Sequence, residues 1–257
     1  MSLLRRIGYL FALPVILIAL WWLKTVLSES YYIPTPPQLV TTFVHTWLGP
    51  RLISDILPSV VRLLIGLAVT IVGGVALGVL IGSVRWLRQL LEPLLEFFRA
   101  IPPPVLVPLL MLLIGINPQM KVVVIMSGAI WPVLLNTVEG VRATDEVLSD
   151  TSRSYGITGI ARLRYLIIPG ATPQIMTGVR QCLSIGLILM VISEMFGSSS
   201  GLGFTIILFQ RNFAVPEMWS GIAVLGLIGI GLAFCFQLVE KRMLNWYHGL
   251  REVQRDN

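Results

Sequence analysis

The densest group of small polar residues is the glycine and serine run from Gly197 to Gly203, and such runs can cradle phosphate through backbone amides. A nucleotide-binding loop also needs a lysine after its last glycine to reach the terminal phosphates. No G-x-x-x-x-G-K-[ST] pattern occurs, because the lysines stand elsewhere, at Lys24, Lys121 and Lys241. The sequence therefore indicates no ATP site, and we interpret residues 194–216 as a flexible outer connection.

Metal ligation and nucleophilic catalysis also lack candidate residues. His45 and His248 are far apart, and neither has a cysteine, aspartate or glutamate at ligand spacing. Cys182 and Cys235 lie within apolar runs, where cysteine behaves as a small hydrophobic residue. No G-x-S-x-G pattern occurs. The sequence thus indicates no catalytic residue, no metal and no bound cofactor, and we expect that the chain is not an enzyme.

The longest water-compatible segment within the apolar sequence is DEVLSDTSRSYGITGIARLRYLIIPGATP, at 145–173. Asp145 is a typical N-cap for a first helix, and Gly156 can end that helix in the left-handed conformation. Thr158 can then cap a second short helix that ends before Pro169. The segment is therefore predicted to form a helix–turn–helix that docks on a partner.

This segment resembles the cytoplasmic loop of the permease subunits of bacterial ABC importers, written E-A-A, three residues, G, nine residues, I, one residue, L-P. Here D-T-S at 150–152 takes the place of E-A-A, Gly156 follows at the family spacing, and L-I-I-P at 166–169 closes the pattern. The first triplet departs from the family but keeps an acid followed by small residues. Three further stretches resemble the nitrate/sulfonate/taurine-type subgroup: LEFFRAIPPPVLVPL at 95–109, LLNTVEGVR at 134–142 and EMFGSSSGLGF at 194–204.

The resemblance implies a fold, partners and a solute. In that family the loop inserts into a groove on a separate ATPase subunit, and two permease subunits form the pathway. The resemblance implies an all-α polytopic fold of six transmembrane helices (the type I ABC importer fold). It also implies a pair of ATPase subunits, a homodimer of permeases and an external substrate-binding protein. The implied solute is a small organic or inorganic anion. The residues that would contact the ATPase are Val147, Leu148, Asp150, Thr151, Tyr155, Gly156, Ile160, Leu163 and Pro169.

The composition points to a membrane independently of the resemblance. Of 257 residues, 55% are hydrophobic and only 12% are charged, which is too apolar for a soluble domain of this size. The formal charge of +6 could suggest nucleic acid, but the basic residues are scattered between apolar runs and form no stripe. The chain is therefore predicted to span the lipid bilayer several times and to bind no nucleic acid.

Apolar runs predict a first helix with an external loop over 1–56, the loop holding a short surface helix, and a five-helix permease core over 57–257 with the coupling loop at 145–169. Prolines in the third span, at 102–104, indicate either a kink or a broken helix beside a pathway. The expected spans are Ile7–Leu23, Leu57–Ser83, a third from Glu92, Lys121–Val138, Gln174–Met195 and Trp219–Val239.

Several residues within the spans suggest packing or transport roles. Small residues four apart in the second span let another helix approach closely, within one subunit by preference or at a subunit interface: Gly66, Thr70, Gly74, Gly78 and Gly82. Glu96 and Arg99 can pair on one helix face. Asn136 needs a polar partner, which we expect on another helix rather than on a solute. We expect an apolar, weakly binding pathway, with Met111, Met126, Trp131 and Asn136 as candidate residues.

Basic residues are distributed unevenly between the two ends of the spans. Twelve lie on one side, namely Arg5, Arg6, Arg85, Arg88, Arg142, Arg153, Arg162, Arg164, Lys241, Arg242, Arg251 and Arg255, and four on the other, namely Lys24, Arg51, Lys121 and Arg211. Because basic residues favour the cytoplasmic side, both termini and the docking segment are predicted to be cytoplasmic. The resemblance implies that the membrane is the inner membrane of a bacterium.

Two other classes of protein remain as alternatives. An ion-coupled secondary transporter, which works without an ATPase, would need intramembrane acids and internal repeats. Apart from Glu92 at the start of the third span, Glu96 and Glu194 are the acids inside the expected spans, both near span ends, and no repeat is visible. A structural membrane scaffold gives no reason for a docking segment. We therefore expect the permease subunit of an importer.

Overall fold

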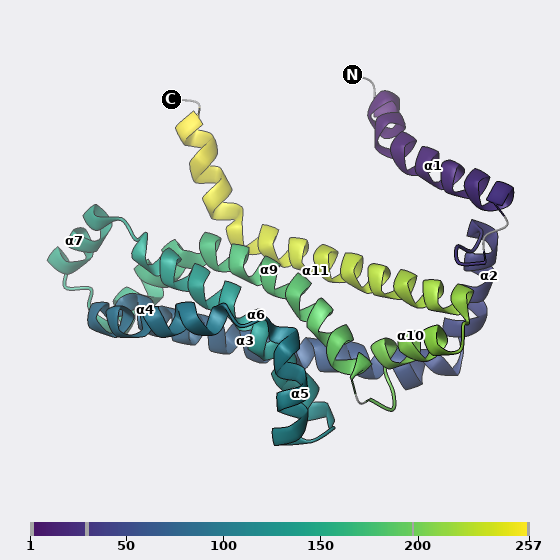
Figure 1. Ribbon diagram of the computed structural model, residues 1–257. Coiled ribbons are helices and arrows are strands. Elements are labelled where there is room, and N and C mark those ends of the chain that lie inside the picture. The colour runs from purple at the N-terminus through teal and green to yellow at the C-terminus, as the bar shows by residue number, and fades with distance from the viewer. Residues whose placement is uncertain (1–2, 29–30, 197, 256–257) are drawn as a thin grey trace. The chain divides into compact units, whose positions relative to one another are not determined.

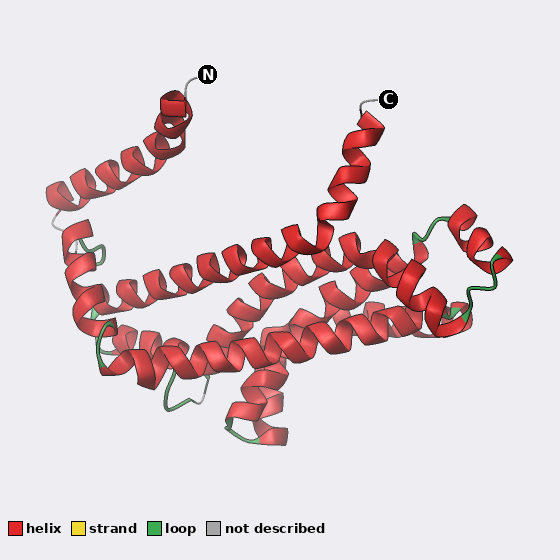
Figure 2. Cartoon of the chain, turned by 180° about the vertical axis from the view of Figure 1, so that it is seen from behind, coloured by secondary structure: helices red, strands yellow, loops and turns green. Residues whose placement is uncertain are grey.

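The computed structural model describes residues 3–28, 31–196 and 198–255, with side chains in 12–28, 31–196 and 198–247. Gly197 of the glycine-rich run and the terminal residues 1–2 and 256–257 lie outside these ranges. All regular structure in the described ranges is helical (Figure 2). The elements are α1 (Leu3–Ser28), α2 (Pro36–Trp47), the π-helical turn η1 (Leu52–Ile56), α3 (Leu57–Ser83), α4 (Arg85–Arg99), α5 (Pro103–Ile114), α6 (Pro118–Arg142), α7 (Glu146–Ser154), α8 (Gly159–Arg162), the π-helical turn η2 (Leu163–Ile167), α9 (Ile168–Met195), α10 (Leu202–Arg211) and α11 (Val215–Arg255) (Figure 1).

Several helices are long and apolar enough to cross a membrane. Within the described residues these are Leu52–Ser83, Pro118–Arg142, Gly159–Met195 and Val215–Tyr247. The pair α4 and α5, bent by 91°, can form a fifth span. Pro102 precedes α5 and two further prolines open it, where a missing amide donor costs no helical hydrogen bond. The break predicted at these prolines is confirmed, and the part of the chain that the structure describes is all-helical with four or five candidate spans.

Internal contacts divide the chain into two units, and each is described separately. The first unit combines the chain up to Pro58 with Ser199–Leu227. Its centre is Trp47, the last residue of α2, which is buried and donates Nε1 to Ser220 Oγ at 2.8 Å. The Trp47 ring also meets the Phe209 ring edge to face, with centroids 6.2 Å apart. The short helix predicted before residue 56 is therefore present and packs through its C-terminal end.

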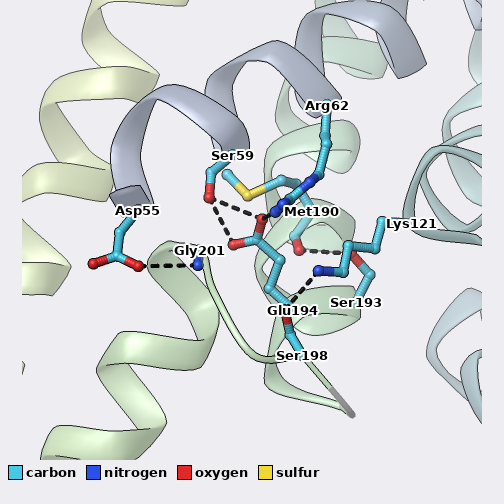
Figure 3. A network of polar contacts seen from close by, with 9 residues as sticks. All are labelled: Asp55, Ser59, Arg62, Lys121, Met190, Ser193, Glu194, Ser198 and Gly201. Carbon is cyan, nitrogen blue, oxygen red and sulfur yellow. Dashed lines mark hydrogen bonds and ion pairs between the residues drawn. The ribbon is translucent and has the colours of Figure 1, made fainter. Parts of the chain in front are cut away.

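The prediction of a flexible connection over 194–216 was wrong where α10 forms. The sequence of α10, LGFTIILFQR, contains no proline, and its buried residues Leu202, Thr205 and Phe209 have the spacing of one helix face. Gly201 directly before it has a φ of +116°, a conformation that favours glycine. The Gly201 amide donates to Asp55 Oδ1 at 3.2 Å, as drawn in Figure 3. The end of the glycine-rich run thus anchors the start of a helix.

The second unit combines Ser59–Ser198 with the chain from Ile228 onward, and the glycines of α3 pack against α6 in it. A Cβ added to Gly66, Gly74, Gly78 or Gly82 would come within 2.9 Å of a side-chain atom of Ile125, Val133, Thr137 or Val141, respectively. The partners advance along α6 in step with the glycines along α3, so the two helices run parallel with closely approaching backbones. The stripe of small residues therefore packs within one subunit, as preferred from the sequence.

Helix α9 approaches α6 equally closely at Gly178. A Cβ added there would lie 2.5 Å from Pro132 O and 3.0 Å from Val133 Cα, both backbone atoms of α6. Because backbone atoms cannot rotate away, we expect that Gly178→Ala forces the helices apart and costs about 1–3 kcal/mol. The thermal unfolding midpoint of the full chain in detergent should fall accordingly.

The matched control is Gly170→Ala, at a glycine of the same helix with no atom within 4 Å of the added Cβ. This variant should keep the midpoint of the unmodified chain or raise it slightly, because alanine favours a helix more than glycine does. Equal midpoints for the two variants would contradict the close packing of α6 and α9.

Candidate docking surface, groove and charge cluster

The segment predicted to dock on a partner begins as its sequence indicates. The Asp145 carboxylate caps α7 by accepting a hydrogen bond from the Leu148 amide at 3.1 Å. At the other end, Gly156 has a φ of +70°, and the Ile157 amide donates to Ser152 O at 2.8 Å. This is the left-handed helix end that glycine permits. The predicted N-cap and the predicted glycine turn are both confirmed.

The second half of the segment differs from the prediction. Its helix does not end before Pro169, since Gly159–Met195 forms one helix of 37 residues that includes α8, η2 and α9. Proline has no amide to donate, and the π-helical turn before it shifts the hydrogen bonding, with the Ile168 amide donating to Leu163 O. Pro169 then lies in the first turn of α9. Thr158 takes the N-cap position of α8 in extended conformation, without a side-chain capping bond.

Four of the predicted contact residues carry exposed apolar side chains, and we call them the docking surface. They are Val147 (73% exposed), Leu148 (55%), Tyr155 (80%) and Ile160 (84%). The two helices that carry them are tied together, because Arg162 Nη2 donates to Ser149 Oγ at 2.7 Å. Large apolar side chains exposed together on an otherwise polar segment are typical of an interaction site.

The other predicted contact residues have different surroundings. Asp150 is exposed on α7 and lies 3.6 Å from Arg153, measured from Oδ1 to Nη1. Thr151 is exposed, and its hydroxyl donates to a backbone carbonyl one turn earlier, at 2.7 Å. Leu163 and Pro169 are half-buried where the segment joins α9. Among the predicted contact residues, the exposed apolar area is therefore carried by the four residues of the docking surface.

A groove of about 470 Å³ lies where α4 and α5 meet α6 and α9. Its polar lining includes Arg99, Trp131 and Gln181, and its apolar lining includes Pro103, Leu135 and Leu189. The Arg99 guanidinium pairs with Glu96, with 2.6 Å between Nη2 and Oε2, so the pair expected on one helix face is present.

The predicted pathway residues are not all in this groove. Trp131 lines it. Asn136 lies outside its lining, and its Oδ1 accepts a hydrogen bond from Gln174 Nε2 of α9 at 3.0 Å. The partner of Asn136 is thus another helix, as preferred from the sequence. Met111 and Met126 are half-buried and are not among the lining residues of the groove.

A buried charge cluster joins α3, α6 and α9 within the second unit, and Figure 3 shows its side chains turned toward one another. Arg62 Nη1 lies 2.7 Å from Glu194 Oε1, and Ser59 Oγ lies 2.8 Å from both carboxylate oxygens. The Glu194 side chain is fully buried and that of Arg62 is 12% exposed. Lys121 is also buried and donates Nζ to Ser198 Oγ at 2.5 Å. We call these five residues the charge cluster.

The Arg62–Glu194 pair was not predicted from the sequence. Its partners are 132 residues apart, so no local spacing reveals them. The available signal was the arginine itself, because a charge inside an apolar run requires a partner at the same depth on another helix. The pair ties α3 to α9 near the end of α9.

Several known proteins resemble this chain. The profile of the family described as "Binding-protein-dependent transport system inner membrane component" matches residues 74–245. The taurine transport system permease protein TauC of Escherichia coli (strain K12) is 29% identical over 247 residues, which cover 93% of this chain and 88% of TauC. The putative aliphatic sulfonates transport permease protein SsuC of the same organism is 30% identical over 241 residues, which cover 92% of each chain. A chain of the MetNI methionine ABC transporter in an inward-facing conformation has a TM-score of 0.63 at 18% identity, covering 74% of this chain and 94% of that chain, and shows likeness in fold.

Proposed function

The chain belongs to the family of binding-protein-dependent transport system inner membrane components, and we propose that it is the permease subunit of an ATP-driven ABC importer. In this proposal two copies of the chain form the translocation pathway. A pair of ATPase subunits binds at the docking surface, and an external binding protein delivers the solute. Relatives named as permeases for taurine and for aliphatic sulfonates favour a small anionic solute.

The proposed topology has six spans with both termini in the cytoplasm. Helix α1 supplies the first span, the bent pair α4 and α5 supplies the third, and the four long apolar helices supply the others. Twelve basic residues against four favour the side that carries α7 as the cytoplasmic one. This orientation places the docking surface where an ATPase can reach it.

The docking surface is the observation that carries the proposal. A cytoplasmic ATPase needs a firm contact through which its movement reaches the spans, and exposed Tyr155 and Ile160 offer large apolar anchors for such a contact. When ATP closes the ATPase pair, the two docking segments would move together and rock the spans from inward-open to outward-open. The remaining contact candidates, among them Asp150 and Thr151, would line the rim.

Replacing Ile160 with aspartate should release the ATPase. Ile160 is 84% exposed here, and burying an unpaired carboxylate at the contact would cost about 2–4 kcal/mol of binding free energy. The test is to express the full chain with its ABC ATPase and to purify the complex through a tag on the permease. We expect the dissociation constant of the ATPase to rise on the order of 30-fold or more, with a matching loss of ATPase from the purified complex.

Ile160→Val is the matched control, because it keeps an apolar side chain at the same position and should retain the ATPase. Binding-protein-stimulated ATP hydrolysis, measured on the same preparations in proteoliposomes, should follow ATPase retention. Full retention of the ATPase by the aspartate variant would contradict the assignment of the docking surface.

A further inference from the structure

The bend between α4 and α5 lies halfway along α6. A Cβ added to Gly128 of α6 would meet Pro103 Cγ at 2.6 Å, so the first residue of α5 touches α6 at this point. At a rise of 1.5 Å per residue, Gly128 is about 15 Å from the start of α6 and about 21 Å from its end. Arg99 is the last residue of α4, directly before the bend. It therefore lies near the middle of the span that α6 forms.

A charge at that depth is costly and calls for a function. The Arg62–Glu194 pair has a structural role, because its side chains are 12% and 0% exposed and it joins two helices. Glu96 and Arg99, in contrast, belong to the same helix, and their side chains are 53% and 49% exposed. A half-exposed pair three residues apart joins no helices and stabilises its own helix only slightly. Packing therefore does not explain why an arginine is present in the groove.

The chemistry of the groove singles out Arg99 as a ligand for oxyanions. A guanidinium has five N–H donors in a fork that matches the oxygens of a sulfonate or carboxylate. The Trp131 Nε1 is already used, since it donates to Ser127 O at 2.8 Å. Glu96 occupies part of the fork, as a carboxylate that an incoming anion can replace.

We propose that Arg99 is the anion contact of the groove and binds the sulfonate or carboxylate group of a solute in transit, in competition with Glu96. The assignment rests on the proposed function, because it takes the groove to be part of the pathway. Competition from Glu96 keeps the affinity low, which suits a site that must release its ligand. Ethanesulfonate serves as the probe, because it offers the oxyanion group with little else.

The experiment measures how ethanesulfonate protects a thiol in the groove. Gln181, an exposed lining residue, is replaced by cysteine in a full-length chain carrying Cys182→Ala and Cys235→Ser, and its reaction with uncharged N-ethylmaleimide is followed. With Glu96→Gln added, millimolar ethanesulfonate should slow the reaction several-fold, while tetramethylammonium chloride at the same ionic strength should not. Adding Arg99→Gln should abolish this protection.

Two further variants test whether protection depends on the guanidinium of Arg99 and not on any nearby positive charge. Arg99→Lys retains the charge without the fork, so its protection should be weaker than with arginine but present. Arg85→Gln removes an arginine at the other end of α4, about 21 Å away along the helix, and should leave protection unchanged. Equal protection with and without the Arg99 guanidinium, or none in the Glu96→Gln chain, would overturn the proposal.

Binding of the ATPase, measured on the same chains, separates this inference from the proposed function. Normal ATPase binding without protection by ethanesulfonate would remove only the anion contact. Protection that depends on Arg99 in a chain that binds no ATPase would retain the anion contact and remove the importer assignment.

Discussion

Replacing Glu194 with alanine should leave little folded protein. The change leaves the buried Arg62 guanidinium without its carboxylate, and breaking a buried ion pair on one side costs about 3–5 kcal/mol. That is a large share of the stability of a typical protein. The yield of monodisperse full-length chain in mild detergent, and its thermal midpoint, should both fall sharply.

The double replacement Arg62→Met with Glu194→Leu tests whether the missing charge partner is the cause. Apolar residues of similar volume often replace a buried ion pair without loss of stability, so the double variant should recover most of the yield that either single variant loses. A double variant as unstable as Glu194→Ala would show that the pair itself does not account for the loss.

Replacing Gly156 with valine should abolish both stimulated ATP hydrolysis and transport while leaving the spans folded. The φ of +70° at this position costs a β-branched residue on the order of 1–3 kcal/mol, and relaxing it would change the direction of Tyr155 relative to α8. No atom lies within 4 Å of a Cβ added to Gly156, so the effect comes from the backbone and not from a clash. The complex should lose binding-protein-stimulated hydrolysis and solute uptake in proteoliposomes.

Gly156→Asn is the control, because asparagine tolerates the left-handed conformation better than other residues with a side chain. It should keep most of the stimulated hydrolysis. If valine and asparagine variants were equally active, the turn would not set the direction of the docking surface.

The sequence predicted best those features that depend on neighbouring residues. The Asp145 cap and the Gly156 turn follow from local backbone chemistry, and both are present. Features that depend on distant residues were missed, among them the Arg62–Glu194 pair. The helix through Pro169 was missed for another reason, because a π-helical turn removes the conflict that makes proline a helix breaker.

The helix that continues from α8 through α9 has a mechanical consequence. At 1.5 Å per residue its 37 residues span about 55 Å. The helix begins at Gly159, next to Ile160 of the docking surface, and ends at Met195, next to Glu194 of the charge cluster. A rod of this kind transmits a push at one end to the other, and the π-helical turn Leu163–Ile167 interrupts its regular hydrogen bonding near the docking surface. The stiffness of that turn would then determine how much of a nucleotide-driven displacement reaches the far end of the rod and how much is absorbed as local bending.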